Sequence, residues 1–523
     1  MKIKINPLLI TAHSISFLID DDGLYYTQNQ YDIYIDDDKV MSTKTAVNSI
    51  FNLESDTSYE LILRNESGED VCRHAFKTEY EFMTINVKDM GAVGDGVHDD
   101  TEFIQAAILA APSKSRVLVP KGKYLVKSLF LKSDVNIEIA KNAVLLADTN
   151  KETRVRFPGS IKTSNPDDDE YHLGTWEGNP EPMFAGIING INVENVVLYG
   201  QGIVDGQSSV DNWWNNPKVM NIAYRPRMLF LNKCCNVNVQ GVMLTNSPSW
   251  TVHPFFSKNL KFIDMCIKNP QDSPNTDGID PESCQNVEIA GVKFSLGDDC
   301  IAVKSGKFYM GQKYKSPSDN IFIHHCLMEN GHGAVTLGSE IAGGVTNVLV
   351  ENCVFKDTDR GLRIKTRRGR GRNCFLDNIM FRNINMNGVL SPFTANMFYF
   401  CDPDGHSPYV QSRDELPVDE RTPKLGKLVF ENIRAVDAHV CAAYFLGLPE
   451  EKIDSVEMKD VFVSFAEDAK EGVPIMSDGI WPMKKRGIVA RNVGSLVIKN
   501  VKIIGYEGDK LTLSQVDDVE EEN

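Results

Sequence analysis

The sequence lacks long apolar runs, an excess of positive charge and any regular pairing of cysteines. No apolar run approaches the ~18 residues that a membrane-spanning helix requires, which excludes a helical membrane protein. Lys and Arg number 55 against 72 Asp and Glu, and the net charge of −17 argues against a nucleic-acid binder, which normally carries the opposite sign. The 11 cysteines are odd in number and include no CxxC pair, which disfavours a disulfide framework or a zinc site.

The amino-terminal residues contain no recognisable secretory signal. The short apolar stretch at 8–12 is ended by His13, and no A-x-A cleavage pattern follows it. We therefore expect a cytoplasmic protein whose thiols stay reduced and pack as small hydrophobic groups. A secreted location would require that a leader had been removed.

Residues 1–80 have the pattern of a small all-β domain. Alternating polar and apolar runs, such as 15–19 and 31–35, are separated by turn clusters rich in Asp, Asn and Gly. The stretch 53–59 is similar to the tyrosine-corner region of fibronectin type III domains. We therefore expect a fibronectin type III-like β-sandwich at 1–80.

From residue 84 to 515 the sequence repeats one short template. A turn Asn leads into an alternating strand, and a second strand usually follows. The clear copies begin at Asn195, Asn236, Asn259, Asn286, Asn320, Asn347 and Asn378. Intervals of 23 and 27 residues are too short for the ~40–50 residues of a propeller blade. The pattern therefore favours an all-β fold in which a parallel β-helix at 84–515 follows the sandwich, over a propeller or a large sandwich.

The two ends of the repeat region carry their own signals. An amphipathic helix is expected at 103–111, with Asp99 or Asp100 as its N-cap, where it would cover the open hydrophobic end of the coil stack. The last residues, 516–523, are mostly acidic and are predicted to form a disordered tail.

Polar clusters interrupt the strand pattern once per repeat between residues 275 and 365. They are Asn275-Thr276-Asp277-Gly278, Gly297-Asp298-Asp299-Cys300, Gly331-His332-Gly333 and Arg363-Ile364-Lys365. Equivalent positions of successive coils stack about 4.8 Å apart, so these clusters should share one outer face. The apolar steps expected to align are Ile279, Ile301, Val335 and Leu362, preceded by Asp277, Asp299, Gly333 and Gly361.

These residue types point to cleavage of an acidic sugar chain. Carboxylates packed this closely repel one another, so at least one pKa is raised and one carboxyl stays protonated while its neighbours are ionised. A protonated and an ionised carboxyl flanking a glycosidic bond are the working groups of a glycoside hydrolase. Arg363 and Lys365, which both point outward, would bind the carboxylate of an anionic sugar.

In their order and spacing, the four clusters resemble the signature of glycoside hydrolase family 28, the polygalacturonases and their relatives. The likeness covers residues 84–510. It implies a right-handed parallel β-helix that hydrolyses pectic α-1,4-galacturonosyl bonds with inversion. It also implies that Asp298 is the general acid, that Asp277 and Asp299 activate the attacking water, and that His332 tunes the proton of the acid.

The resemblance further implies a set of substrate contacts. Arg363 and Lys365 would hold the uronate carboxylate, and Asn275 would support the first cluster. Tyr399 is the candidate for the tyrosine that contacts substrate in this family. The implied enzyme needs no metal and no organic cofactor, and its partner is a galacturonan or oligogalacturonate.

Other polar segments allow two interpretations. The insertions 159–182 and 205–224 precede the catalytic coils and would close one end of the cleft, which predicts exo action on chain ends. Trp213 and Trp214 are either core residues or a sugar platform. The basic stretch 367–372 is either a solvated turn or part of a site for an anionic ligand. Asp280 is expected to be structural.

Three rival functions remain open. A rhamnogalacturonan or substituted-galacturonan hydrolase would have less use for Arg363 and Lys365. A pectate lyase on the same fold would need Ca²⁺ held by carboxylates. A non-catalytic carbohydrate-binding β-helix would bind the sugar chain without turnover. The sequence does not determine the oligomeric state.

Overall fold

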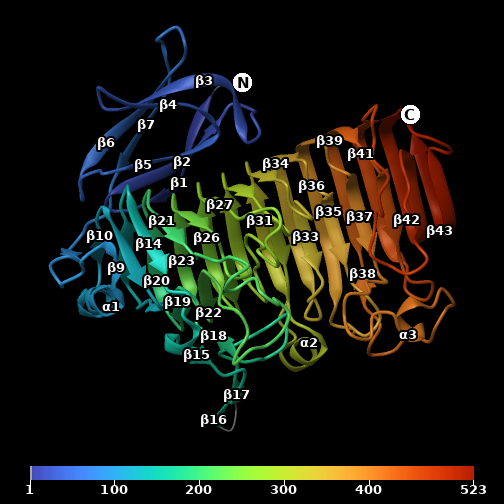
Figure 1. Ribbon diagram of the computed structural model, residues 1–523. Helices are drawn as coiled ribbons and strands as arrows, with labels where there is room; N and C mark the ends of the chain where they lie inside the picture. Colours follow the sequence, from blue (N-terminus) through green and yellow to red (C-terminus); the bar gives the residue numbers. More distant parts are fainter. Residues whose placement is uncertain (1–2, 166–167, 523) are drawn as a thin grey trace.

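The computed structural model describes residues 3–165 and 168–522, which form a small β-domain on the flank of a long coil of strands (Figure 1). The small domain is a sandwich of a three-stranded sheet, ordered β1-β2-β5, and a four-stranded sheet, ordered β4-β3-β6-β7. Its strands are β1 Lys4–Ile10, β2 Ser14–Asp20, β3 Tyr26–Ile35, β4 Asp38–Thr45, β5 Val47–Phe51, β6 Ser58–Arg64 and β7 Asp70–Lys77. The predicted β-sandwich is confirmed.

The long domain is a parallel β-helix built from three ladders of strands. The first ladder begins each repeat at the turn Asn. Its strands are β8 Thr84–Asn86, β10 Ser115–Val119, β13 Val135–Ile139, β20 Glu194–Tyr199, β23 Cys235–Gln240, β26 Lys258–Ile263, β28 Gln285–Ala290, β31 Ser318–His324, β34 Val345–Lys356, β36 Phe375–Asn387, β38 Lys424–Leu425, β39 Lys427–Ala438, β41 Ile453–Phe465, β42 Arg486–Ile504 and β43 Leu511–Glu522.

The second and third ladders complete each coil. The second comprises β9 Asp95–Asp99, β11 Gly122–Val126, β14 Ala143–Ala147, β21 Ile203–Asp205, β24 Met243–Thr245, β27 Cys266–Lys268, β29 Lys293–Ser295 and β32 Leu327–Glu329. After β32 it continues in the carboxyl-terminal halves of the long strands β34, β36, β39, β41 and β42. The third comprises β12 Leu129–Phe130, β19 Ile188–Ile191, β22 Leu229–Asn232, β25 Val252–Phe255, β30 Ile301–Val303, β33 Val335–Gly338, β35 Arg360–Lys365, β37 Ser391–Asn396 and β40 Cys441–Leu446. The third ladder carries the polar clusters singled out in the sequence.

The turn asparagines explain why the chain coils with this period. Asn195, Asn236, Asn259, Asn286, Asn320, Asn347 and Asn378 all have φ between 54° and 56°. Asn tolerates this left-handed conformation better than other residues with a Cβ atom. Its side chain also bonds along the stack: Asn286 Nδ2 donates to Asn259 Oδ1 (2.9 Å), and Asn320 Nδ2 donates to Asn286 Oδ1 (2.8 Å). Each turn therefore fixes the register of the next.

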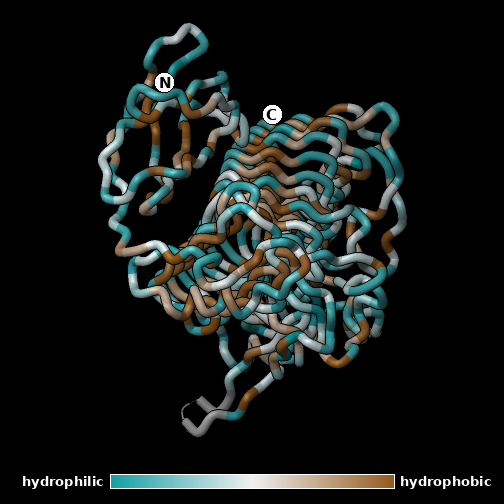
Figure 2. Tube along the Cα trace, turned by 60° about the vertical axis from the view of Figure 1, so that its left-hand side comes forward, coloured by the Kyte–Doolittle hydropathy of each residue, from teal (hydrophilic) through white to brown (hydrophobic). Residues whose placement is uncertain are grey.

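Apolar side chains from all three ladders fill the coil, so one continuous core runs along the domain. Figure 2 shows the stacked rungs from a view closer to the coil axis, with hydrophobic residues recurring along each rung. Helix α1 (Thr101–Ala110) buries Ile104, Ala107 and Ile108 at the amino-terminal end of this core. The predicted helix is therefore present, and it begins after Asp100. Asp100 occupies the N-cap position, as one of the two predicted candidates, but its carboxylate accepts hydrogen bonds from Val93 N and Gly94 N and none from the first turn of the helix.

The remaining elements lie in the loops. The short helices are α2 Phe308–Tyr314, α3 Pro408–Gln411 and the 3₁₀ turn Lys151–Thr153. The two-stranded sheets pair β15 Arg156–Phe157 with β18 Met183–Phe184 and β16 Ile161–Asn165 with β17 Asp168–Tyr171. No helix among the described residues is long and apolar enough to cross a membrane.

The acidic carboxyl terminus is a strand, and the prediction of a disordered tail at 516–523 was wrong for the described residues. Strand β43 pairs in parallel with β42 from Leu511 to Glu522. Lys499 Nζ lies 2.8 Å from Glu520 Oε1, and Lys510 Nζ lies 2.7 Å from Glu521 Oε1. Backbone pairing and these ion pairs offset the repulsion that the acidic composition suggested.

Candidate active site

The polar clusters lie on adjacent rungs of the third ladder, in the predicted register. Ile279 pairs with Ile301, Ile301 with Val335, and Val335 with Leu362. Their side chains are buried, so the alternating residues of the same strands face outward. The prediction for Gly361 is off by one residue. Asp277, Asp299 and Gly333 each lie two residues before the aligned apolar residue, whereas Gly361 lies directly before Leu362.

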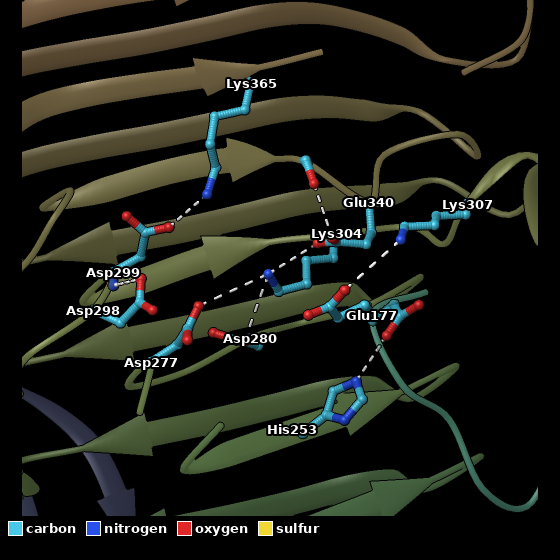
Figure 3. Close-up of polar contacts among 12 residues, drawn as sticks. Glu177, His253, Asp277, Asp280, Asp298, Asp299, Lys304, Lys307, Glu340 and Lys365 are labelled. Atoms are coloured by element: carbon cyan, nitrogen blue, oxygen red, sulfur yellow. Dashed lines mark hydrogen bonds and ion pairs between the residues drawn. The ribbon is translucent and has the colours of Figure 1, made fainter. Parts of the chain in front are cut away.

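These outward side chains line a cleft of about 350 Å³. Its lining includes Asn275, Asp277, Asp298, His332, Arg363, Lys365 and Tyr399. Asp299 lies beneath, fully buried and in contact with Arg363 and Lys365. The structure therefore brings together every site residue predicted from the sequence (Figure 3 shows the carboxylates and Lys365).

Asp299 is held by two cations. Arg363 Nη1 donates to its Oδ1 at 2.9 Å, and Lys365 Nζ donates to its Oδ2 at 2.8 Å. Burial by itself would raise the pKa of Asp299, but Lys365 and Arg363 hold it far below its usual range. Asp299 is therefore a permanent carboxylate. The oxygens of Asp277, Asp298 and Asp299 lie within 4.8 Å of one another, but this pairing leaves the trio poorly suited to hold a divalent cation.

Asp298 is paired with His332. His332 Nδ1 lies 3.4 Å from Asp298 Oδ1, and the hydrogen bond to Asp298 raises the pKa of His332 above its ordinary 6.5. Burial raises the pKa of Asp298, but the bond from His332 and the charges of His332 and Lys365 together leave that pKa below its usual range. His332 and Asp298 therefore share one proton, which His332 holds more strongly.

Asp277 has the opposite electrostatic character. Burial, followed by repulsion from Asp280 and Asp298, raises the pKa of Asp277 well above its usual value. The sequence predicted that at least one carboxyl of the cleft would have a raised pKa. Asp277 and Asp280 have raised pKa values, whereas that of Asp298 is lowered. The reason is local: Asp298 has His332 beside it, whereas the nearest cation to Asp277 is Lys304 Nζ, 3.9 Å away.

The predicted substrate-binding residues have distinct partners. Asn275 Oδ1 accepts a hydrogen bond from Arg225 Nη2 at 2.7 Å, so this residue is tied to the neighbouring loop. The ring of Tyr399 lies on the cleft wall with Lys365 Nζ 5.7 Å from its centroid. Asn275 is therefore held in place by Arg225, and Tyr399 offers a ring face near the cationic groups.

Sequence reasoning missed several residues of the cleft. Trp250, Lys304 and Glu340 line it. Asp280 lies beside them, fully buried, and neither of its carboxylate oxygens has a hydrogen-bond partner among the described residues. Lys304 could have been noticed as a charged residue directly after an apolar strand. It pairs with Glu282 of the preceding rung. Glu340 follows its strand in a loop, and nothing in the sequence pattern places it here.

The basic stretch 367–372 is an internal ion-pair hub. Arg368 Nε and Nη2 donate to both oxygens of Glu450, at 2.5 and 2.8 Å, and Arg368 is 1 % exposed. Arg367, Arg370 and Arg372 pair with Asp404, Asp402 and Glu451 respectively. The anionic partners are side chains of the protein, so neither the solvated turn nor the ligand site describes this stretch.

The two insertions meet at the cleft. Trp176 of the first stacks on Tyr224 of the second, with ring centroids 4.7 Å apart. Glu177 and Lys218, one from each insertion, line the cleft, and Lys307 N donates to Gly178 O at 2.9 Å. Trp213 is buried against Phe184 and is therefore a core residue.

The structure thus combines a parallel β-helix with a cleft of acidic and basic side chains on one ladder. The sequence profile of glycosyl hydrolases family 28 matches residues 110–473. The chain belongs to this family. It is 30% identical over 396 residues to a probable polygalacturonase of Vitis vinifera, covering 74% of this chain and 76% of that protein.

Other relatives include bacterial enzymes. An endo-polygalacturonase of Pectobacterium carotovorum is 31% identical over 314 residues, which cover 57% of this chain and 72% of that one. Among solved structures, a Yersinia enterocolitica family 28 exopolygalacturonase superposes with a TM-score of 0.70 at 17% identity, covering 99% of this chain and 98% of that one. A Thermotoga maritima exopolygalacturonase gives a TM-score of 0.61 at 24% identity, covering 77% and 94%. The fold is therefore the right-handed parallel β-helix.

Proposed function

We propose that the protein hydrolyses α-1,4-galacturonosyl linkages of pectic galacturonan or its oligomers, from chain ends and with inversion. The observation that carries the proposal is the gathering of three carboxylates, one of them paired with Arg363 and Lys365, on adjacent rungs of one cleft. The carboxylates supply acid and base chemistry, and the two cations select a sugar that carries a carboxylate.

In this mechanism Asp298 gives a proton to the glycosidic oxygen as the C–O bond to the leaving sugar breaks. Water attacks the anomeric carbon and loses its proton to the ionised form of Asp277, while the permanent carboxylate of Asp299 orients it. His332 supplies the proton that Asp298 passes on, because its raised pKa keeps it protonated beside that carboxylate. Solvent then reprotonates His332 and takes up the proton held by the base. The products are two sugars, one with a new reducing end.

The assignment of the acid has a direct test. An aryl α-galacturonide has a leaving group that needs little protonation, whereas trigalacturonate needs a strong acid. Asp298→Asn should lose about 10²–10⁴-fold in kcat on trigalacturonate and far less on the aryl substrate. Asp277→Asn should lose equally on both. The reverse pattern would make Asp277, with its raised pKa, the acid.

Exo action is supported by the wall that the insertions build. Glu177 and Lys218 narrow the cleft, and the Trp176–Tyr224 stack fixes the loops that carry them. The test is the product profile on polygalacturonate. Exo action releases short products while viscosity falls slowly; rapid loss of viscosity with mixed oligomers would contradict it. Unsaturated products, or inactivation by a chelator, would instead identify a lyase.

Inversion has its own readout. The carboxyl oxygens lie within 4.8 Å of one another, closer than the ~6.5–9.5 Å between carboxyl groups of most inverting glycosidases. The proposal of inversion rests on family membership and on two carboxylates, Asp277 and Asp299, that can share one water. Proton NMR of the first products should show the β-anomer, and an initial α-anomer would establish retention.

A further inference from the structure

The three carboxylates of the cleft differ in which cation accompanies them. Asp299 has Arg363 and Lys365, and Asp298 has His332. Among the described residues, the only basic side chain within 4.0 Å of the Asp277 carboxylate is that of Lys304. The sequence motifs do not include Lys304. It nevertheless supplies the positive charge beside Asp277, as Arg363 and Lys365 do beside Asp299.

Lys304 is built into the floor of the cleft. It is 3 % exposed, and its ammonium lies 4.2 Å from the centre of the Trp250 ring. Its Nζ is 3.2 Å from Glu340 Oε2, 3.8 Å from Asp280 Oδ2 and 3.9 Å from Asp277 Oδ2 (Figure 3). A buried ammonium among three carboxylates is fixed in position by all of them.

Several carboxylate oxygens around Lys304 lack hydrogen-bond partners among the described residues. Asp277 Oδ1 and both oxygens of Asp280 are buried without a hydrogen-bond partner in the described part of the chain. Unpaired buried carboxylates are costly unless a charge compensates them. Burial would lower the pKa of Lys304, but Glu340, Asp280 and Asp277 raise it well above its usual value, so the ammonium stays charged.

We propose that Lys304 is a positioning residue: its ammonium holds the Asp277 carboxyl in the cleft and favours its ionised form, in which Asp277 can accept the proton of the attacking water. This inference rests on the proposed hydrolysis, with Asp277 as a base. Without Lys304, Asp277 would lose its nearby cation, and its pKa, which burial and Asp280 already raise, would rise further. Lys304 therefore acts through Asp277 and need not touch the substrate.

Several charged groups determine the electrostatic potential around Lys304 and Asp277. The carboxyls that face Lys304 are Asp277, Asp280, Asp299 and Glu340, with Glu282 on the preceding rung. The basic groups nearby are Arg227, His253 and Lys307. Burial and the cations Arg227 and Lys304 hold the pKa of His253 well below 6.5, so this ring is neutral.

The experiment compares the pH profile of kcat/KM on trigalacturonate for the wild type, Lys304→Met and Lys304→Arg. Removing the cation raises the pKa of Asp277, and a base works only when deprotonated. The acid limb of the Lys304→Met profile should therefore move to higher pH by about 1 unit or more. Activity lost at neutral pH should return as pH rises, with little change in KM. Lys304→Arg keeps the charge and should keep the limb close to that of the wild type.

The matched control is Lys307→Met, because Lys307 contacts Glu177 and Asp402 and not Asp277. It should leave the acid limb in place. An unshifted limb in Lys304→Met, or a rise in KM at every pH, would overturn the inference, since a substrate contact or a purely structural role gives those results. Wild-type enzyme that fails to hydrolyse trigalacturonate would instead contradict the proposed function. A folded circular-dichroism spectrum of each variant completes the comparison.

Discussion

At the scale of single residues, neighbouring carboxylates in this cleft acquire different protonation states from their immediate partners. Asp298 and Asp299 are adjacent in sequence, yet Asp298 pairs with a histidine, whereas Asp299 pairs with an arginine and a lysine. Asp277 sits among other acids with a single lysine. Motif spacing predicted that these groups would meet. It did not predict which would hold a proton, because that depends on side chains from other loops.

His332 supplies a prediction at this scale. Its hydrogen bond to Asp298 raises its pKa, so it stays protonated to a pH above 6.5, and activity should fall as pH rises through that pKa. His332→Gln should lower kcat on trigalacturonate by about 10²-fold, because the proton supply of Asp298 is lost. The alkaline limb of its pH profile should also change shape.

The same pair affects stability with a defined sign. A group whose pKa is raised on folding stabilises the native state below its unfolded pKa, and this contribution is lost as pH rises through the folded value. The melting temperature of the wild type should therefore exceed that of His332→Gln most clearly below pH 6.5. A difference that grows at alkaline pH would contradict the assignment.

At the scale of the structural element, the turn asparagines set the rungs. Asn286 adopts φ of 56° and makes two bonds along the stack, to Asn259 and from Asn320. This recurrent signal made the strands of the first ladder predictable. Strand β43 was not predictable, because its acidic residues read as a solvated tail until β42 is placed beside them.

Substitutions at Asn286 separate the two contributions of the turn. Asn286→Gly keeps the backbone accessible but loses both side-chain bonds, at a cost of about 1–3 kcal/mol in the free energy of unfolding. Asn286→Val adds the cost of a β-branched residue in the left-handed region, about 1–2 kcal/mol more. Thermal melts should therefore rank the wild type above Gly and Gly above Val. Equal melting temperatures for the two variants would show that backbone conformation is unimportant here.

At the scale of the whole molecule, the sandwich is docked on the flank of the coil (Figures 1 and 2). Val47 packs on Ile263 and Ala290, and Ser14 Oγ donates to Gln240 Oε1 at 2.8 Å. The approach is close, since a Cβ atom on Gly291 would lie 2.4 Å from Val47 Cβ. Both sides of this contact are buried, so we expect the sandwich to brace the coil without reaching the cleft.

Val47→Asp tests this docking. An unpaired carboxylate in the buried contact should detach the sandwich and expose the linker at 78–83 to limited proteolysis. Because the interface lies away from the cleft, kcat/KM on trigalacturonate should stay within about two-fold of the wild type. Val40→Asp, at an exposed position of the same domain, is the control and should leave proteolysis unchanged. A linker that stays protected in Val47→Asp would refute the docking role.

The sequence by itself determined the repeat, the sandwich, the register of the apolar steps and the residues that meet on one face. These properties follow from local causes: strand alternation, the left-handed turn at Asn and the fixed spacing between rungs. Only the tertiary structure decided that Lys304 and Glu340 join the cleft, that 367–372 is an internal ion-pair hub and that Asp277 has the raised pKa. Those outcomes depend on charges brought together from distant segments, because electrostatic energy in a buried site is set by three-dimensional neighbours and not by position along the chain.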